Sequence, residues 1–421
     1  MSCVTKSCNK KSYRSGKWFV SDWNFSPEAT SSFNFAENIV LHDVTLRDGE
    51  QQAGVCFKKD EKIRIADALV EAGIKRIEAG MPAVSRYDAE AITEIVKRHP
   101  DAEIFAFARC MKQDVKRAAD CGVKGIVVEI PASEHVIKVA YQWPLEKAID
   151  LSIEATAYAK ELGLYTVFFP IDGTRSSLDW FLEIVTRVAR EGHMDALVLV
   201  DTFGVCSPHG IAEFVRGVKS RIDKPLEAHF HNDFGLAVAN TLVALAAGVD
   251  VAHVTVGGIG ERAGNCNLEE LVLGLLALYG QELPIDYSKL CSLAELVYGL
   301  AGIPMRGNQP VVGPRLYNIE SGIITSWWEN SKKVDPLEVV PFHWDVVGQN
   351  EPRVVLGKKS GLDSIRVYLQ KMGRADLAEK LDDDKILEIL MEVKERSIQT
   401  KKLISFEEFV EILHSFNILQ A

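Results

Sequence analysis

Two histidines separated by one residue give this sequence its clearest chemical signal. A strand-like apolar run covers residues 226–230, with His229 inside it and His231 directly after it. Strand side chains alternate between two faces, so both imidazoles point the same way. A helical pattern begins at Gly235, which places the pair at the carboxyl end of the strand. Two imidazoles on one face are typical ligands of a divalent cation, and the spacing therefore predicts a metal site.

A third ligand is predicted far upstream. Asp48 lies in a turn after a strand-like segment, and one carboxylate with two neutral imidazoles leaves positions open for water or substrate. Arg47 adds a planar cation suited to a carboxylate or to enolate charge. A glycine-rich loop at 257–265 ends in Asn265, which could supply another oxygen ligand. The metal could be Zn²⁺, Mn²⁺ or Mg²⁺, because mixed Asp and His ligation does not choose among them.

The elements that must position these residues form a repeating pattern from residue 38 to about 280. Eight strand-like segments alternate with amphipathic helical patterns, which predicts an α/β fold, a (β/α)8 TIM barrel. The alternative is a doubly wound open sheet, in which the first and last strands would not pair. The predicted strands are 40–44, 75–78, 103–108, 125–130, 165–169, 196–200, 226–230 and 251–256, and the clearest helices are 60–72, 86–98, 145–162, 178–191 and 208–221.

Polar residues gather at the carboxyl ends of these strands, the face where barrel enzymes carry their chemistry. Glu78 ends the second strand, Arg109 the third and Thr202 the sixth. We predict a catalytic role for Glu78 and a substrate-binding role for Arg109.

Changes in composition along the chain predict four segments. We predict an N-terminal tail at 1–37, the catalytic barrel at 38–282, a Pro- and Gly-containing linker subdomain at 283–340 and a helical C-terminal subdomain at 341–421. The first 20 residues hold five basic and no acidic side chains and lack an apolar signal-peptide core, so we expect a surface tail over an organelle transit peptide. The C-terminal helices are predicted at 360–371, 375–381, 384–400 and 406–413.

Charge and cysteine usage restrict the class of protein. The formal net charge of −11 argues against a nucleic-acid partner, and no apolar run approaches the roughly 20 residues of a membrane span. Eight cysteines are scattered without a Cys-x-x-Cys pair, which suits reduced thiols and predicts a cytoplasmic location.

The motifs together resemble the Claisen-condensing branch of the DRE-TIM metallolyases, the family of 2-isopropylmalate, homocitrate and citramalate synthases. The resemblance implies that Asp48, His229 and His231 hold the metal, that a 2-oxo acid chelates it, and that Arg47 and Thr202 contact this acid and the developing alkoxide. The implied reaction joins acetyl-CoA to the 2-oxo acid. The resemblance covers roughly residues 38–365, in the segments Leu46-Arg-Asp-Gly-Glu-Gln51, Ile77-Glu-Ala-Gly-Met-Pro82, Val200-Asp-Thr-Phe-Gly204, His229-Phe-His-Asn-Asp233, Gly258-Ile-Gly-Glu-Arg-Ala-Gly-Asn265, Val312-Gly313, Glu320-Ser-Gly322 and Leu356-Gly-Lys-Lys-Ser-Gly361.

Three positions depart from the family pattern. Ile171 stands where the fifth-strand motif usually has a glutamate, Ile324 where a catalytic histidine is usual, and Lys359 where another histidine is usual. Both members of the usual acid/base pair are therefore aliphatic here. A synthase with a replaced acid/base and a carbon–carbon lyase of the hydroxymethylglutaryl-CoA lyase type are the alternatives, although the eighth loop lacks the lyase-type Gly-Gly-Cys arrangement.

The substrate and the assembly are predicted from the same resemblance and from the fifth strand. Val167, Phe169 and Ile171 share one face, and burying a second, unpaired carboxylate beside them would cost several kcal/mol. We therefore expect pyruvate or 2-oxoisovalerate over 2-oxoglutarate, unless the three side chains only fill the barrel core. We also expect a homodimer, with a monomer as the alternative, and no leucine-sensing regulatory domain after residue 421.

Overall fold

The computed structural model describes residues 13–419, and its contacts divide the chain into two compact units. The first unit comprises residues 22–305, and the second combines residues 13–21 with residues 306–419. The beginning of the predicted basic tail, residues 1–12, lies outside the described residues. The predicted domain limits at 37, 282 and 340 stay predictions, because a division by contacts does not test independent folding.

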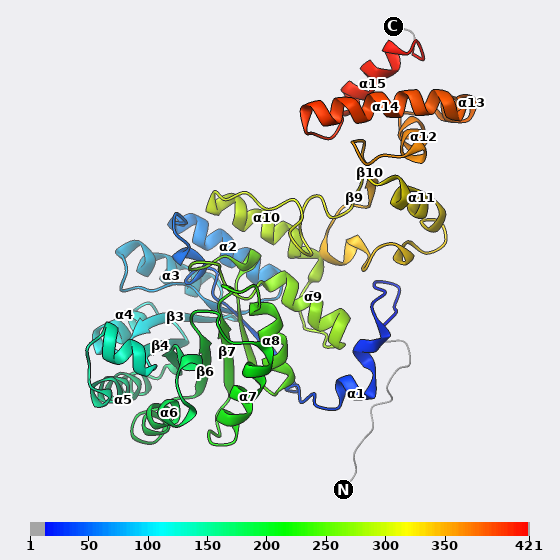
Figure 1. Ribbon diagram of the computed structural model, residues 1–421. Coiled ribbons are helices and arrows are strands. Elements are labelled where there is room, and N and C mark those ends of the chain that lie inside the picture. Colours follow the sequence, from blue (N-terminus) through cyan, green and yellow to red (C-terminus); the bar gives the residue numbers. More distant parts are fainter. Residues whose placement is uncertain (1–12, 420–421) are drawn as a thin grey trace. The chain divides into compact units, whose positions relative to one another are not determined.

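Eight parallel strands form a closed barrel in the first unit, and each strand is hydrogen-bonded to its neighbours in sequence order (Figure 1). The closure joins the first strand to the last, where Val40 pairs with Val251 and His42 with His253. This pairing confirms the predicted (β/α)8 fold and excludes the open sheet. The strands are β1 (Val40–Asp43), β2 (Arg76–Glu78), β3 (Glu103–Arg109), β4 (Gly125–Pro131), β5 (Tyr165–Ile171), β6 (Ala196–Asp201), β7 (Leu226–Phe230) and β8 (Val251–Val254).

Helices follow the strands and surround the barrel. Several begin at a capping side chain: Ser85 accepts a hydrogen bond from the N–H of Asp88, and Ser177 from that of Trp180. Such caps satisfy N–H groups that have no partner inside the helix. No helix within residues 13–419 has the length and apolar character needed to cross a membrane. The helices of this unit are α1 (Pro27–Thr30), α2 (Lys59–Glu71), α3 (Arg86–Arg98), α4 (Lys112–Asp120), α5 (Leu145–Glu161), α6 (Leu178–Glu191), α7 (Pro208–Lys219), α8 (Ala237–Ala246), α9 (Leu268–Tyr279) and α10 (Leu290–Ala301).

Apolar side chains pack the centre of the barrel. Phe105, Val127, Val167 and Val198 are buried in one cluster, each contributed by a different strand. Gly125 makes room for Phe105, because a side-chain carbon at this position would come within 2.2 Å of the Phe105 ring. The barrel is therefore a packed core, and it holds the carboxyl ends of the strands in fixed positions.

The second unit is mostly helical, as predicted for the C-terminal part of the chain. The unit also contains a parallel two-stranded sheet. Trp18, from the N-terminal segment of the unit, forms an isolated antiparallel bridge with Phe342. Ile365, Ile389 and Phe409 lie in its buried core. The elements are β9 (Asn318–Ile319), α11 (Gly322–Ser331), β10 (Arg353–Val354), α12 (Leu362–Lys371), α13 (Ala375–Lys380), α14 (Asp383–Thr400) and α15 (Phe406–Ser415).

Candidate active site and metal centre

The three predicted metal ligands meet at the carboxyl end of the barrel strands. Asp48 lies in the turn after β1, His229 lies within β7, and His231 directly follows β7. Asp48 Oδ2 is 3.4 Å from His229 Nε2 and 3.8 Å from His231 Nε2. The two Nε2 atoms are 3.4 Å apart, and all three side chains are buried. The strand alternation and the barrel closure together thus produce the expected cluster.

This donor set fits a divalent cation. Donor atoms that each lie about 2.1 Å from a common ion are themselves about 3.0–3.4 Å apart, close to the separations seen here. Two further buried atoms, His231 Nδ1 and Asn265 Oδ1, have no hydrogen-bond partner among the described residues. An unpaired buried oxygen costs free energy, and a cation or an ordered water would remove that cost.

Asn265 connects the glycine-rich eighth loop to the cluster. Its Nδ2 donates a hydrogen bond to Asp48 Oδ1 at 2.8 Å, and its backbone forms an isolated bridge with His231. Gly260 permits this approach: it has a φ of +157°, and a side-chain carbon there would lie 2.1 Å from Asn265 Nδ2. One oxygen of Asp48 is therefore held by Asn265 while the other faces the two imidazoles.

Burial and charge set the protonation states that a metal requires. Burial lowers the pKa of His229 and of His231 to about 4, so both imidazoles are neutral at neutral pH. Burial alone would raise the pKa of Asp48, but Arg47 and the two imidazoles hold it well below its usual range. The site therefore presents one carboxylate and two neutral imidazoles, with no proton to displace.

Arg47 lies between Asp48 and Glu78. Its Nη1 donates to Asp48 Oδ2 at 2.6 Å, its Nε donates to Glu78, and its guanidinium carbon lies 4.1 Å from the centre of the Phe107 ring. Its Nη2 is buried and has no hydrogen-bond partner within the described part of the chain. Such a donor can bind an anionic substrate oxygen. Glu78 is completely buried and is bound by Arg47 and His42, so it orients Arg47.

Thr202 and Arg109 lie at the ends of their strands, as the sequence indicates, but neither joins the metal candidates. The Thr202 hydroxyl oxygen accepts the N–H of Asp172 at 2.8 Å, which links the ends of β6 and β5. Arg109 is half exposed, and its Nε donates to Asp114 at 2.7 Å. Among the described residues, no hydrogen bond or ion pair connects either side chain to the three metal candidates.

The three apolar residues of β5 occupy different environments. Val167 is completely buried in the barrel core, and Phe169 is buried with its ring centre 5.0 Å from that of His229. Ile171 is half-buried at the end of the strand. The core-filling alternative therefore describes Val167 and also Phe169, which lies in the same buried cluster. The Phe169 ring in addition contacts a metal candidate, and Ile171 packs against the cluster at the end of the same face.

Glu129 on β4 is a further candidate, a strand-end acid for which the sequence alone predicted no role. It pairs in register with Arg109 on β3 and Phe169 on β5, and it shares the inward face of β4 with Val127. Its side chain is half-buried and forms no hydrogen bond or ion pair with any described residue. Burial raises its pKa, partly opposed by Arg47 and Arg109. The sequence signal for this inward-facing acid is its position two residues after Val127 in the same strand, because residues two apart share one face.

A second cluster of two histidines and a carboxylate lies inside the barrel, but its geometry does not suit a metal. The donor atoms of His42, Glu227 and His253 lie within 4.8 Å of one another. The two rings stack with centres 4.4 Å apart and an angle of 14°, so their in-plane lone pairs lie in nearly parallel planes and do not converge on one ion. Arg76 donates to Glu227 at 2.6 Å and would repel a cation. We therefore interpret this cluster as a buried ion-pair network.

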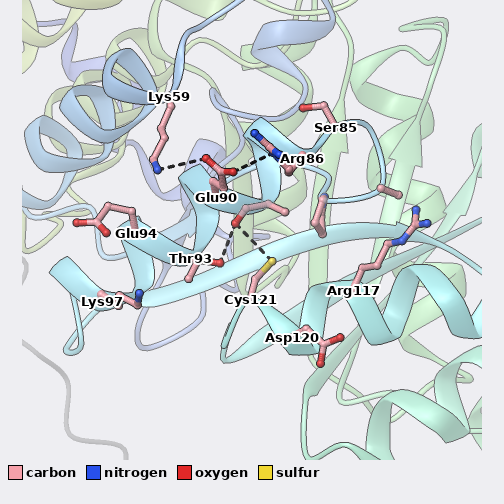
Figure 2. A pocket seen from close by; sticks show the side chains of 13 residues that line it. Lys59, Ser85, Arg86, Glu90, Thr93, Glu94, Lys97, Arg117, Asp120 and Cys121 are labelled. Atoms are coloured by element: carbon pink, nitrogen blue, oxygen red, sulfur yellow. Dashed lines mark hydrogen bonds and ion pairs between the residues drawn. The ribbon is translucent and has the colours of Figure 1, made fainter.

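Two hollows lie near the first strands. A pocket of about 400 Å³ adjoins Arg47 and is also lined by Gln51, Met81 and Phe107. Another of about 690 Å³ is lined chiefly by residues of α3 and α4 (Figure 2), and there Glu90 pairs with both a lysine and an arginine. Only the pocket at Arg47 touches the candidate site, and its size suits a small ligand.

Comparison with known proteins identifies the family. Residues 38–297 match the HMGL-like family model. The chain is 35% identical to a homocitrate synthase of Methanothermobacter thermautotrophicus over 399 residues, which cover 95% of this chain and 98% of that protein. It is also 35% identical to a 2-isopropylmalate synthase of Methanocaldococcus jannaschii over 367 residues, which cover 87% of this chain and 70% of that protein.

Solved structures show the same barrel. A hydroxymethylglutaryl-CoA lyase from Pseudomonas aeruginosa is similar with a TM-score of 0.58 and 21% identity, covering 64% of this chain and 95% of that one. At this identity the similarity concerns the fold alone. The relatives matched over most of the chain place it more narrowly. The chain belongs to the HMGL-like family and, within it, to the Claisen-condensing branch of the DRE-TIM metallolyases.

Proposed function

We propose that this protein is an enzyme that condenses acetyl-CoA with a 2-oxo acid of small or apolar side chain and forms a 2-alkylmalate. The observation that carries the proposal is the cluster of Asp48, His229 and His231 beside Arg47, whose Nη2 has no partner among the described residues. The relatives named homocitrate synthase and 2-isopropylmalate synthase support the reaction class.

Each polar residue of the site has a proposed task. Asp48, His229 and His231, with Asn265 as a further oxygen donor, would hold Zn²⁺, Mn²⁺ or Mg²⁺, and a bound divalent ion supplies Lewis-acid polarisation of a keto group. Arg47 would bind the carboxylate of the 2-oxo acid through Nη2. Thr202 would donate a hydrogen bond to the keto oxygen as negative charge develops there, and Arg109 would contact substrate from β3.

The condensation needs a base, and we propose Glu129. The carboxylate takes a proton from the methyl group of the acetyl thioester, and the resulting enolate carbon bonds to the keto carbon, whose π electrons move to oxygen and take up a proton. Water then cleaves the thioester and releases the thiol of coenzyme A. Glu129 suits the first step because it faces the barrel interior without an ion-pair partner, whereas Ile171 and Ile324 cannot exchange a proton.

The apolar side chains at the end of β5 support a proposal for which 2-oxo acid is bound. Phe169 and Ile171 offer only apolar surface at the end of this strand, and the pocket at Arg47 adds Phe107 and Met81. A second substrate carboxylate would have to be buried there without a partner, at a cost of several kcal/mol. Pyruvate and 2-oxoisovalerate are therefore favoured over 2-oxoglutarate.

A carbon–carbon lyase of the hydroxymethylglutaryl-CoA lyase type is the second candidate function. The aliphatic Ile171 and Ile324 favour it, because the usual acid/base pair of the synthases is missing. The eighth loop argues against it, since residues 257–265 contain no cysteine. The two functions predict different reactions on the same purified protein.

We further propose a homodimer in the cytoplasm. Ile323 and Trp327 lie one turn apart on α11 and are 67% and 55% exposed, which is an apolar surface of the kind found at subunit interfaces. The cytoplasmic location is proposed from cysteine usage, and the six cysteines within the described residues are free.

Release of free thiol from acetyl-CoA in the presence of different 2-oxo acids tests the function. We expect the metal-loaded protein to release thiol with pyruvate or 2-oxoisovalerate. Release with 2-oxoglutarate should be at least about tenfold slower, because a polar group without a partner in an apolar pocket lowers the rate by this factor or more. Absence of release with every 2-oxo acid, together with cleavage of a 3-hydroxyacyl-CoA, would establish the lyase instead.

A further inference from the structure

Four cationic side chains surround one hollow of the second unit. The hollow has a volume of about 660 Å³ and is lined by Arg315, Lys358, Lys401 and Lys402, with Glu320 as its one carboxylate. None of the four cations forms an ion pair with a described residue. This concentration of positive charge is unexpected in a chain whose formal net charge is −11.

Hydrogen bonds to the backbone hold the segments that carry these lysines together. Ser397 lies between them: its hydroxyl accepts the N–H of Lys358 at 3.1 Å and donates to the carbonyl oxygen of Lys402 at 2.7 Å. A backbone hydrogen bond of 2.9 Å from Ile404 to Leu356 fastens the same two segments. The positive charges are therefore brought together by the fold, which like-charge repulsion would oppose unless an anion binds.

Stabilisation of a helix end does not account for the whole group. Lys401 and Lys402 follow the C-terminal end of α14, where positive charge offsets the helix dipole. Lys358 and Arg315 come from two other segments, and the dipole gives no reason for their presence. Some other cations of the unit do have carboxylate partners, as Arg366 has in Asp383 and Arg396 in Glu392.

We propose that this hollow binds an organic anion with two or more phosphate groups, such as a nucleoside bisphosphate. Lysine and arginine donors bind phosphate oxygens through charge-assisted hydrogen bonds. Ile398 and Leu403 also line the hollow and are 48% and 37% exposed, so they offer apolar surface to a base or sugar. Glu320 accepts the N–H of Lys359 at 3.0 Å, which partly satisfies the one opposing charge. The volume lies in the range of small-molecule sites.

Calorimetric titration of the full chain with adenosine 3′,5′-bisphosphate tests the site, and it requires no turnover at the barrel. We expect saturable binding that weakens as salt rises. The double variant Lys358→Gln/Lys402→Gln should bind about tenfold more weakly, because each exposed charge pair contributes up to about 1 kcal/mol. The matched control Lys333→Gln/Lys380→Gln removes two exposed lysines of the same unit outside the hollow and should bind as wild type.

Glu320→Gln keeps the oxygen that accepts the N–H of Lys359 and removes the negative charge, so it should bind more tightly than wild type. Titrations with ADP distinguish the two ligands that could carry such phosphate groups, coenzyme A and a free nucleotide. Tighter binding of adenosine 3′,5′-bisphosphate would indicate the 3′-phosphorylated end of coenzyme A, and tighter binding of ADP would indicate a free nucleotide. Either order supports the site.

The proposal is overturned if neither nucleotide shows saturable binding to the wild type, or if the Lys358→Gln/Lys402→Gln variant binds as the wild type does. Far-ultraviolet circular dichroism verifies that the variants are folded. If the double variant does not fold, the single substitution Lys358→Gln, at an exposed side chain, is compared with Lys333→Gln instead. The expected loss of nucleotide affinity is then smaller.

Discussion

Asn265 Nδ2 donates a hydrogen bond to Asp48 Oδ1 at 2.8 Å, although 217 positions separate the two residues in the sequence. The bond holds one oxygen of the carboxylate and leaves the other facing His229 and His231. The two residues meet because β8, which precedes the loop of Asn265, pairs with β1, which precedes Asp48. The closure of the barrel therefore completes the candidate metal centre.

This relationship predicts how metal binding responds to substitution. Asn265→Ala should weaken metal affinity by about 10–100-fold, the usual effect of removing a residue that orients a ligand, and His231→Ala should weaken it further because a donor is lost. Chelator treatment, reloading and elemental analysis measure the effect. His135→Ala, at an exposed histidine, is the control. Undiminished metal content in His231→Ala would refute the assignment.

Glu129 should determine the rate of the proposed reaction. Glu129→Gln is expected to lower kcat by about 10²–10⁴-fold, the range for loss of a general base, with little change in the KM of the 2-oxo acid. Because a base must be deprotonated and burial raises the pKa of Glu129, wild-type activity should fall as the pH drops through a value above the usual glutamate range.

The nearby charges of Arg47, Arg109 and Glu78 contribute to this titration, so the variant is compared with wild type over the whole pH range. Glu103→Gln, at an exposed residue at the other end of β3, should leave kcat unchanged. If wild type is active and Glu129→Gln retains kcat within about twofold, a different group is the base.

The buried pair of Arg76 and Glu227 should behave as a coupled unit. Arg76→Met leaves a carboxylate in the barrel core without its cation, and we expect a loss of about 3–5 kcal/mol in the free energy of unfolding. Adding Glu227→Gln removes the stranded charge and should recover part of this loss. Urea unfolding of the two single variants and the double variant measures the coupling, and strictly additive effects would contradict it.

Stability should depend on pH through His253. Burial lowers its pKa to about 4, with a smaller contribution from His42, whereas the unfolded value is about 6.5. The unfolded chain therefore binds the proton more readily between these values, and stability is lost as the pH falls from about 6.5 towards 4. His253→Gln should make this part of the curve shallower by up to about 1.4 kcal/mol per pH unit. Denaturant unfolding at several pH values tests it, and an unchanged slope would argue against the assignment.

The exposed apolar face of α11 should control the oligomeric state. Light scattering of the wild type should give the mass of two chains, and Trp327→Lys with Ile323→Lys should give the mass of one, because an interface core does not tolerate unpaired charge. Leu387→Lys with Met391→Lys is a matched change at two other exposed apolar residues, on α14. A monomeric wild type, or dissociation by both pairs alike, would contradict this prediction.

The sequence by itself determined the fold and the meeting of the metal candidates. Alternating strand and helix periods are local properties of the chain, and eight repeats of them predict a closed barrel, which the pairing of β1 with β8 then confirmed against the open sheet. His229 and His231 were predictable as one group because they are two positions apart in a strand, and Asp48 because it follows a strand that ends at the same face. The strand limits differ by only one or two residues, as at β5, where the predicted end at 169 extends to Ile171.

The tertiary structure alone decided the environment of each side chain, because burial and partnership depend on residues that are distant in the sequence. Val167 and Ile171 share one face of β5, yet the packing of neighbouring strands buries the first and leaves the second half-exposed. Glu129 looks like an ordinary strand-end acid in the sequence, and only the arrangement of β3, β4 and β5 leaves it without an ion-pair partner among the described residues. The lysine-lined hollow arises in the same way, from segments that no sequence period connects.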